Sequence, residues 1–245
     1  MISEFYFSAR NYLVTGSGSG IGREITELLV SRDNNVFAVD KDMESLNFLS
    51  TKLNSARLNI LTGDITREEI RKEIVERSAN LDGIVNCAGI IKLIPFKFIN
   101  EDFLSELDKN NYEAPLLLNS ALLKKNRIKD GASIIFLSSI MSVISTQTNA
   151  VYTGTKAALA AVTKTMALET APHKIRVNSV SPGFVKTPML EYIGLQTDLK
   201  VAERNHPLGF GDAKDVAGPV MFLLSDASRW ITGTNLIIDG GYCAK

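Results

Sequence analysis

Short apolar runs alternate along the chain with longer amphipathic segments. A short apolar run bounded by turn residues predicts a buried strand, whereas apolar residues that recur every three or four positions predict a helix. The pattern predicts strands at 11–15, 35–39, 57–61, 81–86, 133–138, 176–180 and 235–238. It predicts helices at 20–32, 43–53, from about 67, from about 102 to 125, from about 150 to 170, and at 212–224. Thr66 is the expected N-cap of the third helix, with Glu69 completing a capping box.

This alternation of strand and helix predicts a parallel sheet with helices on both faces. Right-handed crossovers then give a doubly wound α/β fold of the Rossmann type, in which helices flank seven parallel strands. No repeat or interdomain linker interrupts the pattern, so we expect residues 1–245 to form one domain. Residues 184–211 are the least regular stretch, and we interpret them as a candidate lid over a substrate.

Composition narrows the choice of partners. The 27 basic residues equal the 27 acidic residues, so nothing favours nucleic acid or an anionic membrane surface. No apolar run approaches the roughly 18 residues of a membrane span, and residues 1–10 do not resemble a signal peptide. Cys87 and Cys243 lie far apart and the two histidines are isolated, which predicts no metal site and a reduced, cytoplasmic compartment.

A glycine-rich loop separates the first predicted strand from the first predicted helix. Thr15–Gly22 reads Thr-Gly-Ser-Gly-Ser-Gly-Ile-Gly. Glycines allow a tight turn and a close backbone approach, while the free amides and the dipole of a helix start attract an anion. In this position the loop predicts a site for the pyrophosphate of a dinucleotide. Its candidate residues are Gly16, Ser19, Gly20, Ile21 and Gly22.

Asp40 ends the second predicted strand, 18 residues after Gly22. An acidic side chain near this spacing accepts hydrogen bonds from a ribose 2′-hydroxyl and repels a 2′-phosphate. Lys41 follows and would weaken that repulsion. Asp40 therefore favours NAD over NADP as the cofactor.

Tyr152 and Lys156 are four residues apart, so they share one face of a predicted helix. A phenol has an ordinary pKa of about 10, and a neighbouring ammonium group lowers it. Such a pair can exchange a proton with an alcohol or carbonyl oxygen. Ser139 lies 13 residues before Tyr152, at the end of a strand, where doubly wound folds bind their ligands. Ser138 is adjacent, but the alternation of side chains directs only one of the two serines to the site.

With these segments the chain resembles the compact short-chain dehydrogenases/reductases over essentially its whole length. Thr15–Gly22 matches the TGxxxGxG loop of that family, and Asn86–Gly89 resembles its NNAG segment. Tyr152–Lys156 matches YxxxK, Ser181–Gly183 matches the SPG turn, and Asp239–Gly241 resembles the C-terminal DGG. The resemblance implies an NAD(H)-dependent oxidoreductase that interconverts a secondary alcohol and a ketone by hydride transfer.

The resemblance also implies roles for individual residues. Tyr152 would be the acid/base, Lys156 would lower its pKa and hold the nicotinamide ribose, and Ser139 would orient the substrate. Asn111 would support a water-mediated proton relay to the lysine. The implied cofactor contacts are Asp64 and Ile65 at the adenine, Asn86, Ala88 and Gly89 on the adenosine side, and Pro182, Gly183, Val185 and Thr187 after the sixth strand, the last two at the carboxamide.

Three departures from the family pattern affect these expectations. Cys87 replaces the second Asn of NNAG, and we interpret it as a small packed residue rather than a reactive thiol. Asn110 precedes Asn111, so the sequence leaves open which of these two asparagines is the relay residue. Pro115 falls inside the predicted fourth helix and should kink it or remove a hydrogen bond. The family builds a dimer interface on that helix, and the resemblance favours a homo-oligomer, a tetramer or a dimer.

The expected substrate pocket is mostly apolar, with Ser145 and Asn149 as polar contacts. Lys92 and Lys186 are expected in solvent, and His206 is expected in a surface loop. No arginine offers a carboxylate clamp, so a neutral or weakly polar hydroxy or keto compound is the expected substrate. The segments expected to line this pocket are Ile90–Ile94, Ile140–Ser145, Asn149 and Phe184–Ile193.

Two alternative functions stay open. The first is a 3-oxoacyl-[acyl-carrier-protein] reductase, an activity that uses NADPH and that Asp40 disfavours. The second is a protein that binds NAD without catalysis. The complete set of Ser139, Tyr152 and Lys156 weighs against the second, because binding alone does not need all three.

Overall fold

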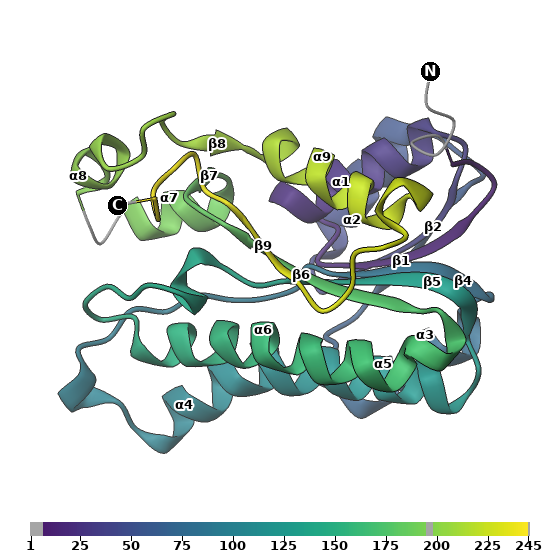
Figure 1. Ribbon diagram of the computed structural model, residues 1–245, viewed down its shortest axis with the longest axis horizontal. Helices are drawn as coiled ribbons and strands as arrows, with labels where there is room; N and C mark the ends of the chain where they lie inside the picture. The colour runs from purple at the N-terminus through teal and green to yellow at the C-terminus, as the bar shows by residue number, and fades with distance from the viewer. Residues whose placement is uncertain (1–6, 195–197, 245) are drawn as a thin grey trace.

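The computed structural model describes residues 7–194 and 198–244, and a parallel seven-stranded sheet forms its centre (Figure 1). The strand order is β3-β2-β1-β4-β5-β6-β9, and every neighbouring pair is parallel. The predicted doubly wound fold class is therefore confirmed. The strands are β1 (Asn11–Thr15), β2 (Asn35–Asp40), β3 (Leu58–Thr62), β4 (Leu81–Asn86), β5 (Ile128–Leu137), β6 (Arg176–Pro182) and β9 (Asn235–Ile238).

Two layers of helices cover the sheet (Figure 1). One layer contains α1 (Gly20–Ser31), α2 (Met43–Leu53) and α9 (Ala213–Leu224). The opposite layer contains α3 (Glu68–Arg77), α4 (Glu101–Asp108), α5 (Ala114–Lys124) and α6 (Ala150–Thr170). Beyond the ends of the strands lie a small sheet of β7 (Val185–Lys186) and β8 (Gly211–Asp212) and the short helices α7 (Pro188–Gly194) and α8 (Leu199–Arg204). The expected lid, 184–211, corresponds to this region, although its residues 195–197 lie outside the described part of the chain.

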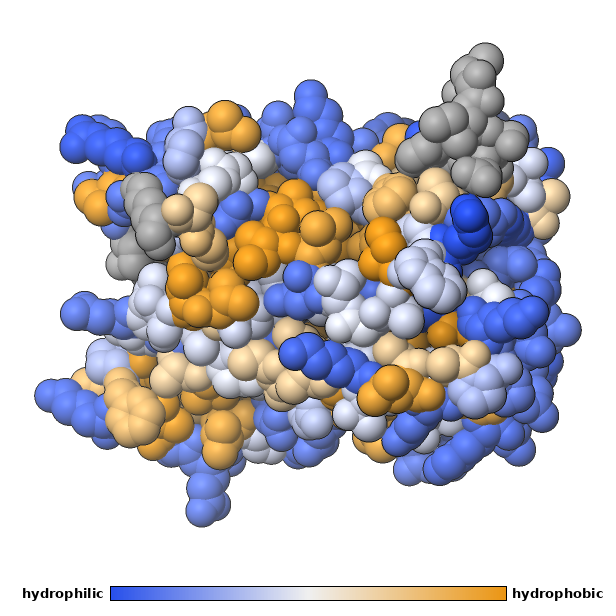
Figure 2. Space-filling view, in the orientation of Figure 1, coloured by the Kyte–Doolittle hydropathy of each residue, from blue (hydrophilic) through white to orange (hydrophobic). Residues whose placement is uncertain are grey.

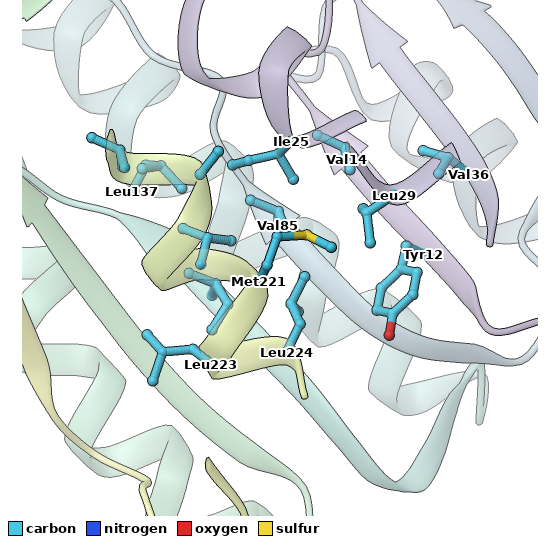
Figure 3. Packing of buried hydrophobic residues seen from close by; sticks show 14 of the residues in the cluster. Tyr12, Val14, Ile25, Leu29, Val36, Val85, Leu137, Met221, Leu223 and Leu224 are labelled. Carbon is cyan, nitrogen blue, oxygen red and sulfur yellow. The ribbon is translucent and has the colours of Figure 1, made fainter. Parts of the chain in front are cut away.

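Strict alternation along the central strands supplies both layers with an apolar surface. Tyr12 and Val14 of β1 pack with Ile25 of α1 and Met221 of α9 (Figure 3), whereas Leu13, between them, joins the core on the other face. Because both faces of the sheet are covered, its central strands are apolar at nearly every position. This double burial explains why short apolar runs in the sequence predict the strands.

Because the strands are parallel, the carboxyl ends of β1, β4, β5 and β6 lie at the same end of the sheet, at the left in Figure 1. The chain order reverses between β1 and β4, and in doubly wound sheets ligands bind outside the strand ends at this switch point. We therefore expect a ligand-binding site among the loops that follow these four strands.

Two predicted boundaries were wrong. β5 begins at Ile128 rather than at Ser133, and an irregular register against β4 lets the strand start early. Helix α3 begins at Glu68 with Arg67 at its N-cap, so Thr66 is not the cap. The Asp64 carboxylate accepts the Thr66 amide at 2.9 Å, and this turn delays the helix.

The predicted helix at 102–125 contains a π-helical segment, Lys109–Glu113, between α4 and α5. Pro115 follows in the first turn of α5, directly after the π-helical segment, where the regular i→i−4 hydrogen-bond pattern is already interrupted. Asp108 and Ala114, on either side of the segment, keep right-handed helical backbone angles. The proline is thus accommodated by a wider turn that precedes it rather than by a break.

The strand β9 forms one of the two lateral edges of the sheet, and β3 forms the other. Figure 2 shows apolar side chains gathered near the centre of the face that presents β9. Ile237 of β9 is 42% exposed, and among the described strands β9 pairs with β6 alone. An unpaired strand edge beside apolar side chains is a surface that proteins commonly cover. Within the described residues no helix has the length and apolarity that crossing a membrane requires.

Two neighbouring leucines on α5 test the packing of the layer that contains α3, α4, α5 and α6. Leu118 is fully buried, whereas Leu117 is 49% exposed. We expect Leu118→Ala to lower the free energy of unfolding by about 2–5 kcal/mol, because it leaves a cavity in the core. Leu117→Ala should change it by less than about 1 kcal/mol. Urea unfolding of both variants measures the difference, and equal losses would contradict the described packing.

Candidate active site

The glycine loop between β1 and α1 fits closely against the end of β4. Gly16 has a φ of +69°, and a Cβ atom there would lie 2.6 Å from the Ala88 amide nitrogen. A Cβ atom on Gly22 would lie 2.1 Å from the Gly16 carbonyl oxygen. Ser19 precedes the helix and makes no capping hydrogen bond with its side chain. The start of α1 thus faces the cavity through Ser19, Gly20 and Ile21, as an anion site requires.

Asp40 is held at the rim of this loop. Its carboxylate accepts the Gly18 amide at 2.8 Å and the Asp42 amide at 3.0 Å. These two bonds fix the side chain in place beside the exposed Lys41, and both Asp40 and Lys41 line the cavity. A fixed negative charge at this position favours a neutral hydroxyl over a phosphate.

The residues after β3 and β4 divide into cavity and core positions. Asp64, Ile65, Ala88 and Gly89 line the cavity. Asn86 does not belong to the described lining, because its amide donates to the Ile135 carbonyl at 3.3 Å and accepts from Asn119 at 2.8 Å. Asn86 therefore ties β4 to β5 and α5, and its expected contact with the adenosine is not supported by this placement.

Cys87 packs against the core cluster around α1 and α9 and also reaches the cavity wall. Burial raises the pKa of its thiol to about 12, so the reactive thiolate is disfavoured at neutral pH. This environment is the one expected for a packed residue rather than a nucleophile.

Tyr152 and Lys156 lie one turn apart on α6 and are both about 95% buried. The Lys156 ammonium lies 5.6 Å from the centre of the Tyr152 ring and donates to the Leu137 carbonyl at 2.7 Å. Ser139 follows β5, and its hydroxyl is hydrogen-bonded to Tyr152. All three side chains line one cavity. The hydroxyl of Ser138, whose residue also borders the cavity, instead donates to the Lys156 carbonyl at 2.8 Å, so Ser139 is the serine beside Tyr152.

Burial is the largest cause of the pKa shifts of Tyr152 and Lys156. It raises the pKa of Tyr152 to about 12, although the hydrogen bond with Ser139 acts in the opposite direction. It also lowers the pKa of Lys156 to about 8. The net pKa of the phenol therefore lies above its ordinary value, and the expected lowering by the ammonium remains a prediction. The physical reason is that desolvation disfavours both charged forms, and the ammonium is directed at the Leu137 carbonyl.

Asn111 lies in the π-helical segment and is fully buried. Its side chain accepts the Ile90 amide at 2.8 Å and donates to the Ile90 carbonyl at 2.9 Å. A Cβ atom on Gly89 would lie 3.2 Å from the Asn111 Oδ1 atom and 3.3 Å from the Lys156 Nζ atom. The neighbouring Asn110 donates to the Glu106 carbonyl and sits at the cavity rim. Asn111, and not Asn110, is thus the asparagine beside the lysine.

The cavity has a volume of about 940 Å³ and continues from the glycine loop past Tyr152. Its far end is mostly apolar, as expected. Lys92 is paired with Glu106 at 2.6 Å and Lys186 with Asp212 at 3.8 Å. The expected residues that line it are Ile90, Ile91, Leu93, Ile140, Met141, Asn149, Pro182, Gly183, Phe184, Val185, Thr187, Pro188, Met189, Leu190 and Ile193.

Sequence reasoning missed other parts of this wall. Thr146–Thr148, residues 201, 202 and 205 in and after α8, and Tyr242 near the C-terminus also line the cavity. Nothing local marks them, because each reaches the site through the packing of distant segments. His206, expected in a surface loop, is only 4% exposed. That expectation was wrong because three aromatic rings enclose the imidazole.

Comparison with known proteins agrees with this geometry. Residues 16–243 match the family model described as enoyl-(acyl carrier protein) reductase. The chain is 30% identical to an NAD-dependent glycerol dehydrogenase of Listeria innocua, with 99% of this chain and 97% of that protein covered. It is 33% identical to a D-erythrulose reductase of Gallus gallus, with 99% of each covered. The chain belongs to the short-chain dehydrogenase/reductase family. It is therefore an oxidoreductase that acts on CH–OH donors with NAD or NADP.

Other members of the family show the range around this chain. A 3-oxoacyl-[acyl-carrier-protein] reductase of Thermotoga maritima is 32% identical over 94% of this chain and 96% of that protein. A short-chain type dehydrogenase/reductase from Mycobacterium marinum superposes with a TM-score of 0.92 at 26% identity and covers 100% of this chain and 99% of that one. Named relatives thus act on different substrates within one fold, and the site must decide between them.

The burial of Lys156 predicts a pH-dependent stability. Folding lowers its pKa from the usual 10.5 to about 8, which corresponds to about 3 kcal/mol. Between these values the unfolded chain binds more protons, so the contribution of Lys156 to stability is least favourable below pH 8 and improves as pH rises. We expect Lys156→Met to gain stability over the wild type at pH 7, and this gain to shrink by about 2 kcal/mol at pH 10.

Urea unfolding of the ligand-free protein at the two pH values measures this change. Lys164→Met is the matched control, because Lys164 is on the same helix and exposed. A gain for Lys156→Met that stays constant from pH 7 to pH 10 would show that the buried ammonium does not titrate as described.

Proposed function

We propose that this protein interconverts a secondary alcohol and a ketone with NAD(H), using Tyr152 as the acid/base. The observation that carries the proposal is the shared cavity of Ser139, Tyr152 and Lys156, which opens onto the glycine loop. A hydroxyl that orients a carbonyl oxygen, a phenol that delivers a proton and an ammonium beside them are the groups that such a reaction needs.

The residues present fit a dinucleotide. Gly16 leaves no room for a side chain between the loop and Ala88, so the backbone itself forms a cradle at the start of α1. Thr187 packs over Gly20, since a Cβ atom on Gly20 would lie 3.0 Å from the threonine methyl group. The segment after β6 thus meets the glycine loop, and we assign Val185 and Thr187 to the nicotinamide end. Asp64 and Ile65 line the end proposed for adenine.

Proton transfer is the task of the chain's own side chains. A bound nicotinamide would supply the hydride chemistry at the substrate carbon, and the chain's side chains would handle the proton. In reduction, Ser139 donates a hydrogen bond to the carbonyl oxygen, and Tyr152 passes its phenolic proton to that oxygen. The raised pKa of Tyr152 keeps this proton in place at neutral pH. Lys156 carries the positive charge that balances the resulting phenolate. Gly89 lies between Lys156 and Asn111, and Asn111 holds the proposed water of the relay.

NAD is the proposed cofactor, with NADP as the weaker alternative. Support comes from the fixed Asp40 carboxylate and from the NAD-dependent glycerol dehydrogenase among the relatives. A relative from Sus scrofa is a carbonyl reductase that is named for NADPH, so family membership alone does not choose. The choice lies with the charge at Asp40.

The proposed substrate is a neutral hydroxy or keto compound. Among the described residues, Lys41 and Lys156 are the cations of the cavity lining, and neither lies at the apolar far end. Asn149, three residues before Tyr152, is buried, and its Oδ1 atom has no hydrogen-bond partner in the described part of the chain. A hydroxyl group on the substrate would supply that partner. The names of the glycerol dehydrogenase and erythrulose reductase relatives agree with a hydroxylated substrate.

Assembly and location complete the proposal. The exposed Ile237 on the open edge of β9 supports a homo-oligomer, with a tetramer or a dimer as its form. The free thiols of Cys87 and Cys243 support a reducing, cytoplasmic environment.

Removing one hydroxyl group tests the catalytic assignment. We expect Tyr152→Phe to lower kcat by at least about a thousandfold, because no other group donates the proton. NADH binding, followed by fluorescence, should change less than about threefold, a difference below 1 kcal/mol. Tyr12→Phe, far away in the core, is the control and should keep full activity. Unchanged turnover of a panel of ketones by Tyr152→Phe would refute the mechanism, and no turnover by the wild type would favour a protein that only binds NAD.

The charge at Asp40 tests the cofactor. The wild type should prefer NADH to NADPH by at least about tenfold in kcat/KM, because the carboxylate repels a 2′-phosphate. Asp40→Asn keeps an acceptor for the Gly18 amide and removes the charge, so the preference should fall about tenfold. Initial rates with each cofactor measure this. A wild type that prefers NADPH and reduces a 3-oxoacyl thioester would instead support the carrier-protein reductase activity.

A further inference from the structure

An aromatic cluster lies behind the substrate end of the cavity, with His206 at its centre. The His206 ring lies 4.4 Å from the ring of Tyr242, 5.2 Å from Phe210 and 5.3 Å from Phe184, measured between centroids. These rings come from the turn after β6, the connection between α8 and β8, and the C-terminal turn. Phe184 and Tyr242 also line the cavity, whereas His206 itself lies behind them.

Both ring nitrogens of His206 are engaged by main-chain groups. The Nδ1 atom lies 2.7 Å from the Ala202 carbonyl oxygen, and the Nε2 atom accepts the Phe184 amide at 3.3 Å. A carbonyl oxygen only accepts and an amide only donates. The ring therefore carries its proton on Nδ1 and keeps a lone pair on Nε2. With both nitrogens occupied, His206 has no proton to offer to a substrate.

These two bonds join two walls of the cavity. Ala202 belongs to α8, and Val201, Ala202 and Asn205 line the substrate end. Phe184 follows Gly183, in the segment assigned to the nicotinamide end. A Cβ atom on Gly183 would lie 3.2 Å from the His206 Nε2 atom, tighter than ordinary contact. The glycine of the Ser-Pro-Gly turn thus lets the imidazole approach the main chain closely.

The C-terminal turn holds the cluster from the other side. The Asp239 carboxylate accepts the Gly241 amide at 2.9 Å and the Cys243 amide at 2.7 Å. The Gly240 carbonyl accepts the Leu208 amide at 3.1 Å, two residues after His206. Gly240 and Gly241 both have a positive φ, which only glycine adopts without strain. The Asp-Gly-Gly motif therefore clamps the segment that carries the imidazole.

We propose that His206 is a positioning residue that fixes α8, the outer wall of the substrate pocket, to the Gly183–Phe184 turn beside the cofactor. The imidazole sets the distance between these two walls and so the fit of the substrate. The kinetic arm of the test rests on the proposed function, because it measures the KM for a ketone. The arm that measures the anchoring of α8 uses the ligand-free protein and needs no turnover.

The first arm follows the backbone of α8 in the ligand-free protein. His206→Phe keeps an aromatic ring in the cluster and removes both hydrogen bonds, so amide exchange of residues 199–204 should quicken about tenfold. His206→Gln provides an acceptor for the Phe184 amide without the ring and should quicken exchange less. His173→Phe changes the exposed second histidine and should leave this segment unchanged. Hydrogen exchange with mass spectrometry reports all three variants.

The second arm separates substrate fit from cofactor binding. His206→Phe should raise the KM for the ketone about tenfold, while NADH affinity and kcat stay within about threefold. Should His206→Phe fail to fold, His206→Gln gives the same two measurements.

Exchange of residues 199–204 in the His206 variants at the wild-type rate would overturn the inference, as would a loss of kcat with unchanged KM. Faster exchange in a protein whose wild type turns over no substrate would support the anchor and reject the proposed function instead.

Discussion

Parallel pairing of all seven strands is the constraint on which the site depends. It places the carboxyl ends of β1, β4, β5 and β6 at one edge, so residues from distant parts of the chain meet without any local signal. Gly16 after β1 approaches Ala88 after β4 so closely that a methyl group would displace the backbone. Ser139 after β5 then lies opposite the face of α6 that carries Tyr152. Loss of this register would separate the glycine loop from Ser139 and Tyr152.

The interior of the site opposes the charges that its chemistry needs. Burial raises the pKa of Tyr152 to about 12 and lowers that of Lys156 to about 8, so both groups are pushed toward their neutral forms. A buried ammonium with a carbonyl as its partner is costly to stability, and such costs concentrate at functional sites. The core on both faces of the sheet supplies the stability that makes this arrangement tolerable. The buried pair of Tyr152 and Lys156 therefore depends on packing far from it.

Irregular local structure serves the site in two places. The π-helical segment at 109–113 accommodates Pro115 and directs Asn111 toward Ile90 and Lys156. The Asp239–Gly241 turn brings the end of the chain against the segment of His206. In both places a departure from regular helix or strand geometry places a buried polar side chain against a residue that lines the cavity, Ile90 for Asn111 and Phe184 for His206.

The sequence by itself determined the fold class, and it predicted the glycine loop, Asp40 and the Ser139, Tyr152 and Lys156 set that the structure gathers around one cavity, because each depends on local periodicity or on a motif of fixed spacing. It placed six strands within two residues of their observed ends, and it missed the early start of β5 and the cap of α3 because these follow from pairing and turn bonds. Only the tertiary structure decided that Asn86 is a core residue, that His206 is buried and that Tyr242 reaches the cavity. The physical reason is that burial and hydrogen-bond partners come from segments far away in the chain, and a single sequence carries no record of which segments meet.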